Sequence, residues 1–221
     1  MMTNLFSIFD PSTNKFMSLN WLILFLPLML FNWPYWLLPS RMNMLWISLY
    51  KKIFMEFFNL SKKKFSSNLI IFLTIMIIFM NLNLLSLMPY IFTPSSHLSI
   101  NLSLSLSLWV SFMMYGWIIN TNKMFIHLLP MNTPGPLMIF MILIESISNF
   151  IRPWTLAIRL SANMLAGHLL LSLLGSTLEN MPYMLILFLI QNLLMILEIA
   201  VSIIQSYVFS ILSLLYFNES N

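Results

Sequence analysis

The sequence predicts an all-α integral membrane protein, and two observations lead to this prediction. Of its 221 residues, 60% are hydrophobic and only 7% are charged, whereas soluble domains carry about 25% charged residues. The apolar residues also gather in runs of roughly 20, the length that a helix needs to cross a bilayer. We therefore expect a single membrane domain over 1–221, with about five membrane helices and one interfacial amphipathic helix.

Proline positions and segment lengths shape the expected helices. These helices cover 20–38, 41–60, 68–89, 97–120, 136–175 and 181–217. Pro27 and Pro34 should kink the first helix or end it early, because proline lacks a backbone donor. At about 1.5 Å per residue, 136–175 would measure roughly 60 Å, about twice the hydrocarbon thickness. The last two helices are therefore expected to be long and strongly tilted, with 136–175 either continuous or broken at Pro153.

The stretch 41–60 separates polar from apolar side chains around a helix. Arg41, Lys52 and Glu56 fall on one helical face, and the aromatic residues fall elsewhere. This pattern predicts an amphipathic helix in the membrane interface, with its basic residues toward water. A spanning helix is the alternative, and the adjacent charges of Lys51 and Lys52 disfavour it.

The start of the segment 97–120 alternates aliphatic with polar residues. On this period of two, 98–108 would be a strand. A lone strand in lipid leaves its backbone groups unpaired, and no other segment could form a barrel with it. We therefore expect a helix to about Asn120, with its serines bonding back to the preceding turn. A polar turn is expected to follow over 121–135.

Composition excludes several function classes. The chain has no cysteine and only four glycines, which rules out disulfides, thiolate metal sites and a phosphate-cradling loop. Its three histidines are far apart in sequence, so no metal or other cofactor is expected. The basic residues concentrate in 51–64 without interleaved base-stacking residues, which disfavours nucleic acid as a partner.

The basic stretch 51–64 predicts the orientation instead. Lysine and arginine mark the inner side of a membrane, so this stretch should face the cytoplasm or, in an organelle, the matrix. With five spanning helices, the N-terminus then lies outside and the C-terminus inside. The turn with Lys123 falls inside, and the turn with Glu179 falls outside.

Arg159 is the most informative single residue. It lies in the apolar run 156–160, with no acid next to it in sequence. An arginine at the bilayer centre costs about 2.5–3.5 kcal/mol on insertion scales, and a guanidinium keeps its proton in proteins. A permanent charge at this depth needs a water-filled cavity or an anionic partner, which points to ion movement.

Ionisable and amide residues recur every seven positions in the last two helices. Glu145, Arg152 and Arg159 share one stripe of the first of these helices, because seven residues drift only about 20° around a helix. Asn163 joins this stripe, whereas His168 lies on the opposite face. Acidic residues and histidines within membrane helices mark proton relays.

The final helix repeats the pattern. Gln191, Glu198 and Gln205 are spaced by seven, and Ser202 follows Glu198 by four. Glu198 is flanked by apolar residues and is as membrane-embedded as Arg159, which suits a group that binds and releases protons. The alternative is that the polar residues only join the helices, with an internal Arg159–Glu198 ion pair.

The run 152–168 resembles the signature of subunit a of the F-type ATP synthases. Glu198 together with 204–209 is similar to the final helix of that family, and 1–11 resembles the animal mitochondrial form, the insect type in particular. The resemblance covers the whole chain, and 152–168 is its most specific part. Trp154 is bulkier than the family leads us to expect.

The resemblance implies roles for individual residues. The residues implied in proton translocation are Arg159, Glu198, His168, Glu145, Asn163 and Gln205, with Arg152, Ser202 and Glu219 as further candidates. Arg159 would be the stator arginine that faces the ring of c subunits, and the two amides would shape the site around it. His168 and Glu198 would line the half-channel from the intermembrane space, and Glu145 the half-channel from the matrix.

The resemblance also implies an assembly. The partners would be the c-subunit ring, the peripheral-stalk and other small membrane subunits of ATP synthase, and membrane lipid. The chain would be a multi-pass protein of the mitochondrial inner membrane and no enzyme by itself, because it carries no nucleotide site. The alternatives are an antiporter-like subunit of a respiratory complex, which would place lysines inside the membrane, and a non-conducting structural subunit.

Overall fold

Helices form every regular element in the part of the chain that the structure describes. The computed structural model describes residues 5–13, 17–29, 36–61, 67–88, 90–128, 134–178 and 184–220. The helices long and apolar enough to cross a membrane are α3 (Leu69–Ser86), α4 (Leu98–Ile119), α6 (Met138–Leu178) and α7 (Met184–Ser220). The predicted all-α membrane fold is confirmed.

The first expected span differs from the prediction. A 3-10 helix, η2 (Leu19–Phe25), leads into α1 (Leu26–Met29), and together they form an apolar helix too short to cross a bilayer. Pro27 is the second residue of α1, next to the junction with η2, and its ring nitrogen cannot donate a backbone hydrogen bond there. Residues 36–38 are not helical, and Pro34 lies outside the described residues.

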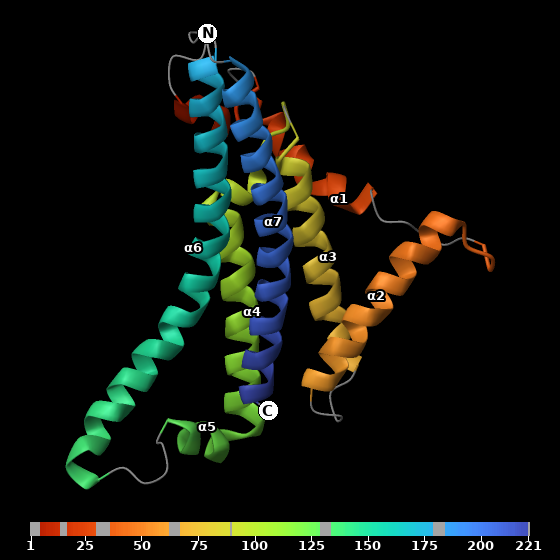
Figure 1. The fold of residues 1–221 in the computed structure, drawn as a ribbon. Coiled ribbons are helices and arrows are strands. Elements are labelled where there is room, and N and C mark those ends of the chain that lie inside the picture. Colours follow the sequence, from red (N-terminus) through yellow and green to blue (C-terminus); the bar gives the residue numbers. More distant parts are fainter. Residues whose placement is uncertain are drawn as a thin grey trace.

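The four long helices pack side by side, with α7 in contact with each of the others. Figure 1 shows them as a bundle, from which α6 bends away in its N-terminal half. The helix is nevertheless continuous through Pro153. Of the two predicted alternatives, the structure therefore has the unbroken helix. Because proline removes one backbone hydrogen bond, it is a common cause of such a bend.

The alternating segment is helical throughout α4, as predicted. Its serine hydroxyls donate to carbonyls three residues earlier, for example Ser103 to Ile100 at 2.8 Å and Ser107 to Leu104 at 2.9 Å. These bonds satisfy hydroxyl groups that would otherwise face lipid without a partner.

The expected turn over 121–135 is partly wrong, because α5 (Thr121–His127) is a short helix. Phe125 packs edge-on against Trp117 of α4, with ring centroids 4.9 Å apart. This contact gives the segment an apolar face. The polar residues on either side of it had led to the prediction of a turn.

Helix α2 (Arg41–Leu60) has the predicted bounds and is joined to the bundle at its C-terminal end. The hydroxyl of Tyr207 donates to Glu56 at 2.9 Å, and Asn218 donates to the carbonyl of Leu60 at 3.1 Å. Figure 1 shows the N-terminal end of α2 pointing away from the bundle. The end of α2, α5 and the C-terminus lie at one end of the molecule, opposite the N-terminus (Figure 1).

Candidate functional site

Glu198 is buried in the interface between α6 and α7. Only 8% of the residue is exposed, and its carboxyl group lies against Gly167. A Cβ atom at Gly167 would fall 2.9 Å from both Cδ and Oε1 of Glu198, closer than a carbon contact allows. Glycine is therefore required for this close approach, and it places Glu198 beside the residue that precedes His168.

His168, the residue after Gly167, contacts α3. The imidazole ring is half-buried and hydrogen-bonds to the backbone of Ser86. The ring of Phe9 meets it edge-on, with centroids 6.4 Å apart. The sequence placed His168 and Glu198 on separate helices, and the structure brings them to the same level of the bundle.

Further buried polar atoms gather at this end of the bundle, and we call the group the Glu198 cluster. Its members with atoms that find no hydrogen-bond partner among the described residues are Asn83, Ser95, His97, Asn101, His168 and Glu198. Buried polar groups are nearly always paired with protein or water. Contacts connect the members, since η4 (Pro94–Ser96) packs on α3, α4 and α6. The cluster therefore offers hydrogen-bond partners to bound water.

Sequence reasoning missed four of the six members of the Glu198 cluster. Asn83 and Asn101 are fully buried, and the amide of Asn101 donates to the carbonyl of Ser95 at 2.8 Å. His97 packs against two aromatic rings, 5.1 Å from Trp21 and 5.3 Å from Phe92 between centroids. The available signal was an asparagine inside an otherwise apolar span, which is costly unless the amide has a partner.

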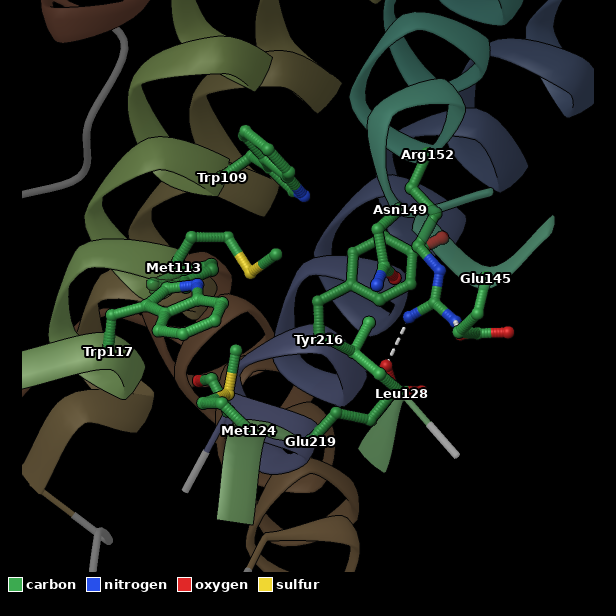
Figure 2. Close-up of a pocket in the computed structure, with 12 residues that line it drawn as sticks. Trp109, Met113, Trp117, Met124, Leu128, Glu145, Asn149, Arg152, Tyr216 and Glu219 are labelled. Atoms are coloured by element: carbon green, nitrogen blue, oxygen red, sulfur yellow. Dashed lines mark hydrogen bonds and ion pairs between the residues drawn. The ribbon is translucent and has the colours of Figure 1, made fainter. Parts of the chain in front are cut away.

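A second polar group, the Arg152 cluster, lies toward the other end of α6 and α7. Arg152 pairs with Glu219 through Nη1, and its Nη2 lies 3.6 Å from Oε1 of Glu145. Figure 2 shows these side chains at the edge of a cavity of about 160 Å³, with Trp109 and Met113 of α4 on the facing side. The stripe of Glu145 and Arg152 was predicted and Glu219 was a further candidate, but the ion pair between Arg152 and Glu219 was not predicted.

An apolar layer separates the two clusters. It consists of Phe79, Leu156, Leu160 and Phe209, all buried. The rings of Phe79 and Phe209 lie 4.7 Å apart between centroids. Along α6, Arg152 and Gly167 are about 22 Å apart at 1.5 Å per residue. The polar clusters thus lie toward opposite ends of the bundle, with the apolar layer between them.

Arg159 lies at the level of this apolar layer, but on the exposed face of α6. Among the described residues it forms no ion pair, so the alternative of an internal Arg159–Glu198 pair is not what the structure contains. The exposed residues three, four and seven positions from it on this face are Ala162, Thr155 and Ala166, which are small and uncharged. An arginine at membrane depth needs water or an anionic partner, and no acidic residue in the described part of this chain pairs with Arg159.

The remaining predicted residues lie around these features. Asn163 and Gln205 are half-buried, on α6 and α7 respectively. Ser202 is buried, and its hydroxyl donates to the carbonyl of Ile199 at 2.7 Å. This bond ties Ser202 to its own helix rather than to Arg159.

The fold and the site together define a multi-pass helical membrane protein with two polar clusters on either side of an exposed arginine. The profile of the family described as ATP synthase A chain matches residues 15–218. The chain therefore belongs to the ATP synthase A chain family.

Full-length relatives agree with this assignment. The chain is 54% identical to ATP synthase subunit a of Locusta migratoria over 223 residues, which cover 99% of each chain. It is 52% identical to ATP synthase subunit a of Drosophila melanogaster over 100% of both chains. It is 51% identical to ATP synthase subunit a of Apis mellifera ligustica over 100% of this chain and 98% of that protein.

Proposed function

We propose that this protein is the stator proton channel in the membrane sector of a mitochondrial F-type ATP synthase. Its family and the names of its insect relatives support the assembly and the inner-membrane location. In this role the chain moves protons and binds no nucleotide, so ATP is made on other subunits.

The observation that carries the proposal is the apolar layer between two polar clusters. The Glu198 cluster forms the half-channel from the intermembrane space, and the Arg152 cluster forms the half-channel to the matrix. The packed rings of Phe79 and Phe209 support a barrier to water between the two clusters. A proton can therefore cross only by leaving this chain on one side of the layer and returning on the other.

Arg159 couples this indirect proton path to rotation of the c-subunit ring. A carboxylate on the partner c-subunit ring takes up a proton from the Glu198 cluster and rotates through lipid in its neutral form. It then releases the proton to the Arg152 cluster and passes Arg159 as an anion, which the guanidinium stabilises by attraction. The same positive charge repels protons and blocks leakage between the half-channels. Each proton that crosses releases about 2.3 kcal/mol per 100 mV of membrane potential.

The exposed face around Arg159 supports the c-subunit ring as the partner. The exposed residues that share its face of α6, Thr155, Ala162 and Ala166, are small and uncharged. A neutral carboxyl group travelling through lipid can pass such a face, while the single charge of Arg159 selects the ionised form. Asn163 and Gln205 would hold water near this passage. Other expected contacts are with peripheral-stalk and small membrane subunits.

The orientation follows from the positive-inside rule. The C-terminal end of α2, α5 with Lys123, and the C-terminus lie at one end of the molecule (Figure 1). This end would face the matrix, and the N-terminus would face the intermembrane space. The basic residues 62–64 and the turn with Glu179 lie outside the described residues.

Arg159→Ala tests the proposal in vesicles that hold the assembled membrane sector. We expect driven, coupled proton transport and ATP synthesis to be lost while the complex still assembles. Arg41→Ala is the matched control, because Arg41 is an exposed arginine at the start of α2. ATP synthesis at the wild-type rate in Arg159→Ala vesicles would instead favour the structural-subunit alternative and end the proposal.

A further inference from the structure

The start of the chain places an aromatic ring against each histidine of the Glu198 cluster. The ring of Phe9, in η1 (Leu5–Phe9), meets His168 of α6 edge-on, with centroids 6.4 Å apart. The ring of Trp21, in η2, lies 5.1 Å between centroids from His97, which directly precedes α4. Two short helices that are neighbours in sequence are therefore packed on two cluster members that belong to different parts of the bundle.

Burial distinguishes these two rings from the apolar side chains beside them. Phe9 is 9% exposed, whereas Phe6 in the same helix is 66% exposed. Trp21 is half-buried and also meets Phe92 edge-on, with centroids 5.5 Å apart, whereas the adjacent Leu22 is 61% exposed. The two side chains that touch histidines are thus packed into the protein, and each has an exposed apolar neighbour.

The polar atoms beneath η1 and η2 are shielded from bulk water. Nε2 of His97, Nε2 of His168 and both carboxyl oxygens of Glu198 are buried without a hydrogen-bond partner among the described residues. A proton moves between groups that are hydrogen-bonded directly or through water. The N-terminus lies at the same end of the molecule as the C-terminal end of α6 (Figure 1). Phe9 and Trp21 therefore occupy space that water would otherwise fill beside the two imidazoles.

Both η1 and η2 are short elements of a type that opens readily. They are 3-10 helices, whose hydrogen-bond geometry is poorer than that of an α-helix, and no residue of η2 is fully buried. Between them, Asp10 accepts from the backbone N–H of Ser12 at 3.3 Å, and the hydroxyl of Thr13 donates to the carbonyl of Met17 at 2.9 Å. Such elements open at a lower free energy than the packed core, so these helices can move without disrupting the four long helices.

We propose that η1 and η2 form a cover over the Glu198 cluster, in which Phe9 and Trp21 seal the two histidines from water. When both rings leave their histidines, water reaches the cluster, and when they return the cluster is closed. The shielding depends only on packing. Its role in proton uptake rests on the proposed function, because opening the cover then admits protons from the intermembrane side.

Access to the cluster can be measured with single cysteines, because the chain has none of its own and the reactivity of a thiol depends on its exposure. Ser86→Cys reports beside His168, which bonds to the backbone of Ser86, and Ser95→Cys reports two residues before His97. Both serines are buried. The assay uses purified ATP synthase in lipid nanodiscs, which leave both membrane faces open, and measures the rate at which a charged thiosulfonate labels this chain.

Removing either ring should open the cluster to the reagent. We expect Phe9→Ala to speed labelling at the first reporter and Trp21→Ala to speed it at the second, each by at least about tenfold. Loss of a packed aromatic ring generally shifts a local opening equilibrium by more than this. Phe6→Ala and Leu22→Ala are the matched controls, because they remove exposed side chains from the same two helices, and they should leave both rates unchanged.

A third reporter separates local opening from general loosening of the bundle. Ser213→Cys replaces a buried serine toward the C-terminal end of α7, and its labelling rate should not change in Phe9→Ala or Trp21→Ala. Faster labelling at all three reporters overturns the cover, as does equal labelling in Phe9→Ala and Phe6→Ala. Reporters that react as fast as Ser12→Cys, at an exposed position, without any second substitution also overturn it.

The cover and the proposed function fail separately. Should Phe9→Ala not assemble, Phe9→Leu decides in its place: faster labelling than in Phe6→Ala supports the cover, and an equal rate overturns it. Retained ATP synthesis in Arg159→Ala vesicles removes the proposed function but leaves a measured difference between Phe9→Ala and Phe6→Ala in support of the cover. Lost coupling in Arg159→Ala together with equal labelling removes only the cover.

Discussion

Gly167→Ala tests whether the carboxyl group of Glu198 must occupy the place that the structure gives it. The added Cβ would lie 2.9 Å from Cδ and Oε1 of Glu198, and carbon atoms in contact are about 3.5 Å apart or more. The carboxyl group must therefore move by at least about 0.6 Å. Alanine favours a helix over glycine by about 0.8–1.0 kcal/mol, so α6 itself is not weakened.

A displacement of this size should impair proton transfer while sparing assembly. Misplacing a reacting group by about 1 Å can slow a reaction roughly 100-fold, so we expect coupled transport in Gly167→Ala to fall about 10- to 100-fold. The assay is ATP synthesis in proteoliposomes, normalised to the amount of intact complex on native gels. Gly175→Ala is the control, because it lies in the same helix with nothing within 4 Å of its added Cβ.

A second-site change sharpens the test. Glu198→Asp shortens the side chain by one methylene, which makes room for the new methyl group, so Gly167→Ala/Glu198→Asp should recover part of the lost transport. If Gly167→Ala transports protons as fast as Gly175→Ala, the position of Glu198 does not matter. The reasoning from close packing would then be refuted.

Two further substitutions probe the channel walls. Asn83→Leu replaces a fully buried amide that has no described partner. We expect unchanged or higher thermal stability, because an unsatisfied buried group costs about 1–3 kcal/mol, but slower proton uptake from the intermembrane side. Normal uptake would exclude Asn83 from the half-channel. Phe209→Ala removes a ring from the apolar layer. We expect a loss of about 3–5 kcal/mol in stability and a passive proton leak that persists when rotation is blocked. If no such leak is measured, the layer is not the barrier to protons.

Periodicity and composition in the sequence predicted the membrane helices well and the segments at their ends poorly. The alternation at 98–108 indicated a strand, but lipid gives a lone strand no hydrogen-bond partners, and α4 is a helix. The short α5 was missed because its stability comes from contact with Trp117 rather than from its own sequence. Pro153 could not be judged from the sequence, since neighbouring helices can support a bent helix without its backbone bond.

The candidate site shows the same division between local and long-range information. The seven-residue spacing was enough to place Glu145 and Arg152 on one stripe, because helical periodicity is a local property. The pairing of Arg152 with Glu219 joins positions far apart in sequence, and no spacing rule reports it.

Hydropathy and helical period, which depend only on neighbouring residues, determined that this chain is a helical membrane protein with an arginine at membrane depth. Tertiary packing decided that Arg159 faces outward, that Gly167 makes room for Glu198, and that Phe79 and Phe209 meet between two polar clusters. The physical reason is that burial is a property of surfaces brought together from different helices. Within one helix, a polar residue that faces a partner and one that faces lipid have the same sequence signature.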